Sequence, residues 1–142
     1  MFGRLTTNIQ PFTPERFLEL GDAYLRSLGV TRQKSAYFLS LAEAATAGNL
    51  ANLARLDDEE ARSALMRVKG IGSWTADIYL LMVLKRPDVW PNGDIALATA
   101  AMNLKKLNSR PSYLQLAEMA ENWRPFRSVA ARMLWQYYLA ER

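Results

Sequence analysis

The sequence predicts an all-α fold, a helical bundle of six to seven helices in a single domain over residues 1–142. Three observations support this prediction. Apolar residues recur at every third or fourth position in most segments, as expected for amphipathic helices. No stretch alternates polar and apolar residues with the period of two that a half-buried strand shows. Helix-starting residues and helix-ending glycines follow one another at short intervals, so the connections between helices are expected to be short.

Each expected helix has a start or a stop signal of its own. Residues 1–5 read as the end of a helix, and residues 6–12 as a polar loop. In chain order the helices are expected from the Thr13-Pro14 start to Gly29, from Thr31 to Gly48, from the acidic run at Asp57 to about Met66, and over about 73–84, 94–107, 111–122 and 125–140.

The composition excludes several kinds of chemistry. The chain has no cysteine and no histidine, so disulfides, thiolate zinc sites, histidine metal sites and histidine-based nucleophilic catalysis are impossible. A net charge of +4 favours an anionic partner, nucleic acid above all. No signal peptide and no apolar run of membrane-spanning length is recognisable, so no membrane contact and a cytoplasmic location are expected.

The segment at about 58–84 has the pattern of two helices joined by a tight hairpin, with the sequence Val68-Lys69-Gly70-Ile71-Gly72 at its centre. Glycine lets backbone amides approach a ligand closely, and the free amides and positive dipole end of the following helix face the same place. These features suit a phosphate, with Lys69 as a nearby positive charge and Ile71 as an apolar plug between the helices. The alternative is a plain turn between helices, where glycine is common.

A lone carboxylate, Asp94, ends the loop at 85–94 and precedes a new apolar helix. It is a good N-cap for that helix. It is equally a candidate catalytic acid or base, and the sequence allows both roles together.

Three motifs in this order resemble the helix-hairpin-helix DNA glycosylase superfamily, and within it the 3-methyladenine DNA glycosylase II branch of alkylation repair. The resemblance covers roughly residues 20–139. The motifs are Val68 to Ala76, Asp88 to Asp94, and Trp123 to Ser128 followed by Ala130, Ala131 and Trp135.

The resemblance implies a role for each matched residue. Asp94 takes the catalytic position, and Trp74 and Trp135 take positions that line the pocket of the flipped base. Both tryptophans are also explained by core packing alone. The hairpin residues expected to hold a DNA phosphate are Lys69, Gly70, Ile71, Gly72 and Thr75. A monovalent cation, Na⁺ or K⁺, is expected on the backbone carbonyls of Met66, Val68 and Ile71, and no other cofactor is expected.

Bifunctional members of the superfamily, such as endonuclease III, carry a strand-cleaving lysine where this chain has Trp74. A monofunctional enzyme is therefore expected, which hydrolyses the N-glycosidic bond of 3-methyladenine or 7-methylguanine in double-stranded DNA during base-excision repair. Two alternatives stay open at this point. One is a helix-hairpin-helix fragment that binds DNA without chemistry, and the other is a glycosylase for oxidised or deaminated purines.

The family's usual N-terminal helices have no counterpart in this sequence, so the chain is expected to be N-terminally truncated relative to the family. Their loss is expected to expose apolar residues of the last helix and to favour a homodimer. The residues concerned are Val129, Met133, Leu134 and Tyr137. Arg124 and Arg127 face phosphate or pair with acids, and Lys105, Lys106 and Arg110 either contact DNA or lie in solvent.

Overall fold

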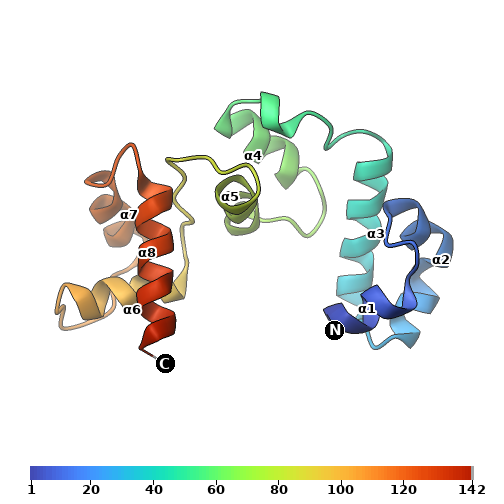
Figure 1. Cartoon of the computed structure of the whole chain (residues 1–142), viewed down its shortest axis with the longest axis horizontal. Helices are drawn as coiled ribbons and strands as arrows, with labels where there is room; N and C mark the ends of the chain where they lie inside the picture. The colour runs from blue at the N-terminus through green and yellow to red at the C-terminus, as the bar shows by residue number, and fades with distance from the viewer. Residues whose placement is uncertain (142) are drawn as a thin grey trace. The chain divides into compact units, whose positions relative to one another are not determined.

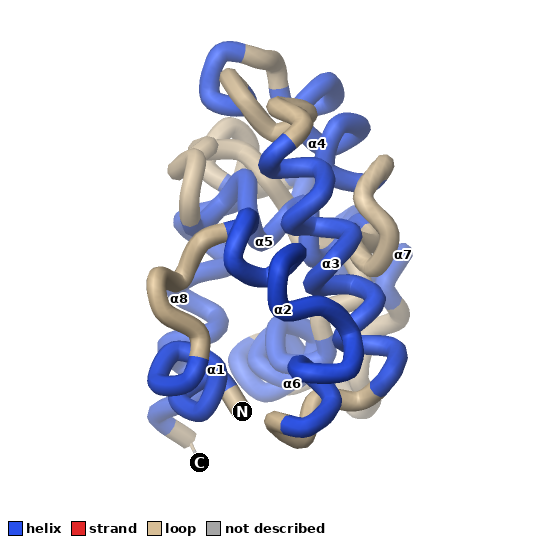
Figure 2. The backbone as a smooth tube through the Cα atoms, turned by 90° about the vertical axis from the view of Figure 1, so that its right-hand side faces the viewer, coloured by secondary structure: helices blue, strands red, loops and turns tan. Residues whose placement is uncertain are grey.

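The computed structural model describes residues 1–141, which consist of helices and loops without a strand (Figure 2), as predicted. The helices, labelled in Figure 1, are α1 (Phe2–Asn8), α2 (Pro14–Ser27), α3 (Arg32–Thr46), the 3₁₀ helix η1 (Leu53–Arg55), α4 (Asp58–Met66), α5 (Ser73–Met82), α6 (Ile95–Leu104), α7 (Tyr113–Glu121) and α8 (Arg127–Ala140). None of the described helices combines the length and the hydropathy needed to cross a bilayer.

The chain divides into two compact units. The first unit comprises Met1–Leu56 and Ser63–Ile71, and the second comprises Asp57–Arg62 and Gly72–Arg142. The boundary therefore crosses α4 and the hairpin. A single domain over residues 1–142 stays a prediction.

The first unit is built on α2 and α3, which lie side by side (Figure 1). Both helices start as expected, because the hydroxyls of Thr13 and Thr31 accept hydrogen bonds from backbone amides of the first turn, at 3.4 and 3.3 Å. The buried core of this unit consists of Leu5, Ile9, Phe17, Leu25, Val30 and Ala42.

The prediction of a loop at residues 6–12 was wrong over its first part, since α1 continues to Asn8. Thr7 donates a hydrogen bond to the carbonyl of Gly3 at 2.9 Å, and Asn8 donates one to the carbonyl of Arg4 at 2.8 Å. These bonds run one turn back along the helix. Residues 1–5 were expected to be helical, and α1 extends this helix by three residues.

In the second unit α8 packs against α6, and α7 contacts both helices. Its buried apolar side chains come from all four of its long helices, and they include Ala76, Leu80, Leu97, Ala101, Leu116, Ala120 and Ala131. Leu134 is also buried, so the prediction that it would be exposed was wrong.

Helices α5 and α6 end two to three residues earlier than predicted. Each is followed within three residues by a lysine with a left-handed backbone, Lys85 at φ 55° and Lys106 at φ 53°. Left-handed positions usually carry glycine or asparagine. Because neither residue occurs at these two positions, the sequence contains no signal that predicts these helix ends.

The start of α8 fixes the loop that leads to Asp94. Arg127 donates from Nε to Oδ1 of Asp88 at 2.8 Å and from Nη2 to the carbonyl of Asp88 at 2.9 Å. Arg124 donates to Oδ2 of the same carboxylate at 2.8 Å. Both arginines also pair with Glu121. Of the two roles left open for these arginines, the structure therefore shows pairing with acids.

Hydrogen bonds from Ser128 to the backbone of this loop reinforce the attachment. Ser128 Oγ accepts from the amide of Val89 at 2.9 Å and donates to the carbonyl of Val89 at 3.2 Å. The amide of Ser128 donates to the carbonyl of Pro87 at 3.0 Å. Ser128 is buried, so its hydroxyl replaces the water that these loop groups would otherwise need.

The carboxylate of Asp88 gives the loop a defined pH dependence. The hydrogen bond from Arg127 lowers the pKa of Asp88 below its ordinary value, while burial opposes that change. A lowered folded-state pKa means that the stabilisation is complete above the unfolded pKa of about 3.9 and is lost as the pH falls through the folded value.

We therefore expect Asp88→Asn to lower the free energy of unfolding at pH 7 by about 1 kcal/mol, as for a partly exposed, hydrogen-bonded ion pair. The deficit should shrink as the pH falls below about 4 toward the lowered folded-state pKa, at which the wild-type carboxylate takes up its proton. Urea unfolding at pH 7, 5 and 3 measures this, with the exposed Glu118→Gln as the control. An equal deficit at all three pH values would contradict the role of the Asp88 charge.

Candidate functional site

Asp94 and Trp74, two of the residues predicted for the site, contact each other directly. The indole Nε1–H of Trp74 donates a hydrogen bond to Oδ2 of Asp94 at 3.0 Å. The backbone amide of Leu97 donates to Oδ1 of the same carboxylate at 3.0 Å. Asp94 therefore caps α6 and also has its second oxygen bound, and only 8% of its surface is exposed.

The position of Asp94 follows from its local sequence. Pro91 is buried, Gly93 has a left-handed backbone with φ 81°, and Asp94 has the extended backbone of an N-cap. The carboxylate lies at the positive end of α6, where a negative charge is favoured. The result is a carboxylate in one fixed orientation and largely removed from water.

Trp74 belongs to the first turn of α5, and a buried ion pair anchors that helix one turn later. Asp77 Oδ1 accepts from Nε of Arg62, in the second unit's part of α4, at 2.7 Å. Burial raises the pKa of Asp77, and the hydrogen bond and charge of Arg62 oppose that rise. Arg62 also pairs with Glu59. Residues three apart on a helix share a face, so this anchor orients the turn that carries Trp74.

Trp135 lies on α8, the helix that packs against α6, and is half-buried. Trp74 is 45% exposed. Within residues 1–141 the two indole rings make no ring-to-ring contact. Their place in one base pocket stays a prediction.

A small cavity of about 200 Å³ lies beside Asp94 on the surface of the second unit. Arg110 and Tyr113, from the segment that leads into α7, line it together with Ile95 and Pro111. Arg110 was predicted only as a contact with DNA or solvent, and Tyr113 was not predicted at all. No sequence signal linked these residues to Asp94, because the packing of α7 near the start of α6 brings them there.

The first half of the hairpin, up to Ile71, belongs to the first unit. Gly70 has φ 95°, and a Cβ added to it would lie 2.3 Å from the ring of Tyr37 on α3. Glycine is therefore required at position 70 both by the backbone and by the close approach of Tyr37. The plain-turn interpretation did not foresee this contact.

The second half of the hairpin begins α5 in the second unit. Gly72 is the N-cap of α5, and no side chain caps the helix there. The amides of the first turn, which includes Thr75, thus lack the side-chain acceptor that caps α6 and α7. An uncapped helix start of this kind suits an external anion.

The three carbonyls predicted for a monovalent cation lie on the segment from Met66 to Ile71. Val68 is buried, and its carbonyl accepts a hydrogen bond from the amide of Ile71 at 3.1 Å. That bond leaves the second lone pair of the Val68 carbonyl available for a ligand.

Comparisons with known proteins point in one direction, although no family model matches the chain. The sequence is 31% identical over 138 residues to DNA-3-methyladenine glycosylase 1 of Schizosaccharomyces pombe, and the match covers 95% of this chain but only 60% of that relative. A solved structure of 3-methyladenine DNA glycosylase from the same yeast, in complex with abasic DNA, aligns with a TM-score of 0.87 at 30% identity, over 95% of this chain and 68% of that one. A DNA-3-methyladenine glycosidase from Bacillus halodurans aligns with a TM-score of 0.85 at 28% identity, over 99% of this chain and 68% of that one.

The double role of Asp94 yields a prediction about stability. Asp94→Ala removes the cap of α6 and should lower the free energy of unfolding by about 1 kcal/mol. Asp94→Asn retains an N-cap oxygen and should stay within about 0.5 kcal/mol of the wild type, although its amide cannot accept the Trp74 hydrogen bond with the nitrogen. Urea unfolding at neutral pH measures both. Equal losses in the two variants would show that the cap is not what Asp94 contributes to stability.

Proposed function

The chain belongs to the family of the 3-methyladenine DNA glycosylases, and on this premise we propose that it hydrolyses the N-glycosidic bond of alkylated purines in duplex DNA. The observation that carries the proposal is the carboxylate of Asp94, buried and bound through both oxygens, twenty residues after the hairpin that carries Trp74.

The chemistry needs little more than a well-placed negative charge. Breaking the N-glycosidic bond builds positive charge on the deoxyribose, and a fixed carboxylate in a poorly hydrated place stabilises such charge. The same carboxylate can orient or deprotonate a water molecule. Methylation at N3 or N7 makes the purine cationic, so the base leaves without an acid catalyst. This fits a chain without histidine.

Trp74 has two functions in this proposal. Its N–H fixes the orientation of Asp94, and its exposed indole surface offers a face for a cationic base, with a cation–π attraction of about 0.5–2 kcal/mol. Trp135 is proposed as a second pocket residue. Because position 74 carries no amine, the product is an abasic site in an unbroken strand.

Double-stranded DNA is the proposed partner, and the solved structure of the yeast relative is a complex with abasic DNA. We propose that the hairpin binds a backbone phosphate through Lys69, Gly70, Ile71, Gly72 and Thr75, and that the carbonyls of Met66, Val68 and Ile71 hold a Na⁺ or K⁺ ion. The uncapped start of α5 supports the phosphate-binding part of this proposal. A cytoplasmic location stays a prediction.

A second candidate is a helix-hairpin-helix module that binds DNA without cleaving the glycosidic bond. The chain spans 60% of the length of the yeast relative, so the activity of that whole protein is a proposal for this chain. The hairpin alone suffices for DNA binding, whereas the glycosylase also needs Asp94 and a complete pocket for the extruded base.

Release of methylated purines from alkylated duplex DNA distinguishes the two. The wild type should release 3-methyladenine and 7-methylguanine and leave abasic sites without strand breaks. Asp94→Asn should release them at least about 100-fold more slowly, as for the loss of an electrostatic catalytic group, while binding DNA normally. Equal rates of base release by the wild type and Asp94→Asn would show that Asp94 has no catalytic role. DNA binding without release by either protein would favour the module, and release of oxidised or deaminated purines instead would change the substrate class.

We also propose that the chain forms a homodimer through the outer face of α8. Val129 and Met133 are 50% and 68% exposed there, and Gln136, Tyr137 and Ala140 continue the same face. A two-fold arrangement places this patch against its own copy and so buries both apolar surfaces at once.

Sedimentation equilibrium tests the dimer. The wild type should show a concentration-dependent mass that rises to twice that of the monomer, and Met133→Glu should shift the curve toward the monomer because it places a charge in the buried patch. Leu114→Glu, at an exposed position on α7, is the matched control and should behave as the wild type. A wild type that stays monomeric at every concentration would disprove the dimer.

A further inference from the structure

The positive charge of the chain is distributed unequally between the two units. The first unit contains eight lysines and arginines against four acids, and the second contains ten against ten. The entire net charge of +4 therefore belongs to the first unit. Duplex DNA attracts positive charge along its whole backbone, so this unit is expected to contact more phosphates than the hairpin alone can reach.

Tyr37 connects the hairpin to α3, which is the next helix to consider for contact with DNA. Its half-buried ring fills the space that a side chain at Gly70 would need, with the nearest ring atom 2.3 Å from the position that a Cβ would take. Gln33, one turn earlier on α3, donates from Nε2 to the hydroxyl of Tyr37 at 2.7 Å. The ring is thus held at both ends, and its hydroxyl proton has no acceptor among the described residues.

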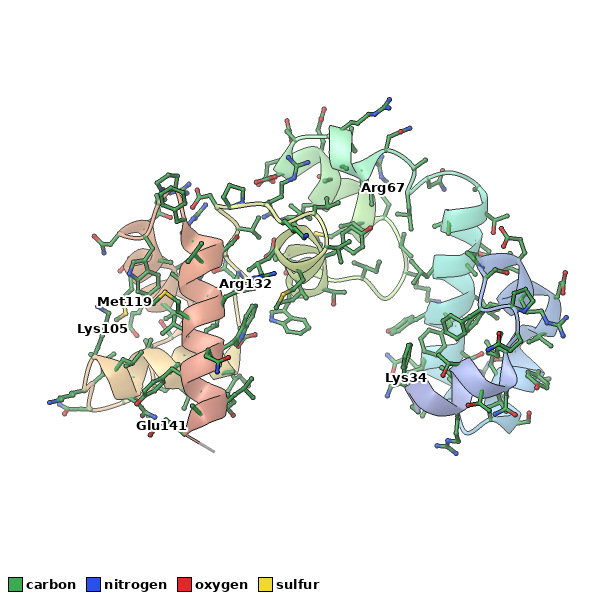
Figure 3. The ribbon with its side chains drawn as sticks, viewed as in Figure 1. Lys34, Arg67, Lys105, Met119, Arg132 and Glu141 are labelled. Atoms are coloured by element: carbon green, nitrogen blue, oxygen red, sulfur yellow. The ribbon has the colours of Figure 1, made fainter. Side chains whose placement is uncertain are left out.

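Lys34 shares this face of α3, because residues three apart lie one above the other on a helix. Its side chain projects from α3 (Figure 3) and is exposed, and it pairs with no carboxylate in the described part of the chain. By contrast, Arg16 and Arg26 on α2 each pair with an acid of their own helix.

We propose that Lys34 and Tyr37 contact DNA backbone phosphates next to the one bound by the hairpin, so that the phosphate-binding surface continues from Gly70 onto α3. Both side chains offer donors without an acceptor of their own, an ammonium group and a phenolic O–H, and such donors bind phosphate without reading the base sequence. The inference rests on the proposed DNA-binding function and deepens it, since it names a second element of the contact.

The salt dependence of binding to an unmodified duplex tests Lys34. Lys34→Gln should weaken binding and make the slope of log K against log salt shallower by about 1, the effect of one lost phosphate contact. Arg26→Gln is the matched control. It removes the same charge from the same unit, but at a residue already paired with Asp22, and should leave the slope unchanged. Equal slopes for the two variants would show that Lys34 does not contact a DNA phosphate.

Tyr37 is tested by two substitutions that separate the ring from the hydroxyl. Tyr37→Phe keeps the ring against Gly70 and should bind several-fold more weakly with an unchanged melting temperature. Tyr37→Leu also loses the support of the hairpin and should lose both affinity and stability. Binding by Tyr37→Phe at wild-type strength would show that the hydroxyl contacts no phosphate. A wild type that binds no DNA at all would overturn the proposed function itself, which distinguishes that failure from a failure of this inference.

Discussion

The candidate site depends on one carboxylate that two donors share. Asp94 accepts the amide of Leu97 through one oxygen and the indole N–H of Trp74 through the other. A buried carboxylate without such partners would be costly, and a carboxylate with them is fixed in place at little cost. The helix-capping and catalytic interpretations are therefore compatible, because the bonds that cap α6 also orient the charge.

The residues around Asp94 also help to hold its carboxylate in a fixed orientation. Arg127 and Ser128 attach the loop that ends in Asp94 to the start of α8, and the Arg62–Asp77 pair anchors the helix that carries Trp74. A glycosylase that relies on one charge has to hold that charge in a fixed geometry before substrate arrives. The polar network of the second unit provides that geometry through side-chain hydrogen bonds.

The sequence predicted most of the fold, because the relevant signals are local. Thr13 and Thr31 cap helices where their residue types favour it, and the period of apolar residues placed every α-helix from α2 to α8 within a few residues. The errors occurred where local signals mislead. The polar run at Thr6 to Asn8 bonds back along its own helix, and Lys85 and Lys106 end helices in a conformation that the sequence gives no reason to expect. Leu134, predicted as surface, is buried in the core.

For the site, the sequence by itself identified the residue types and their spacing, namely a glycine hairpin, Trp74 and a lone Asp94, because each belongs to a short motif. Only the tertiary structure decided which of these residues touch. It joined Trp74 to Asp94, brought Arg110 and Tyr113 beside the carboxylate, paired Arg127 with Asp88, and placed Tyr37 against Gly70. These contacts join residues that lie far apart along the chain, and their partners follow from how helices pack and not from any pattern within a helix.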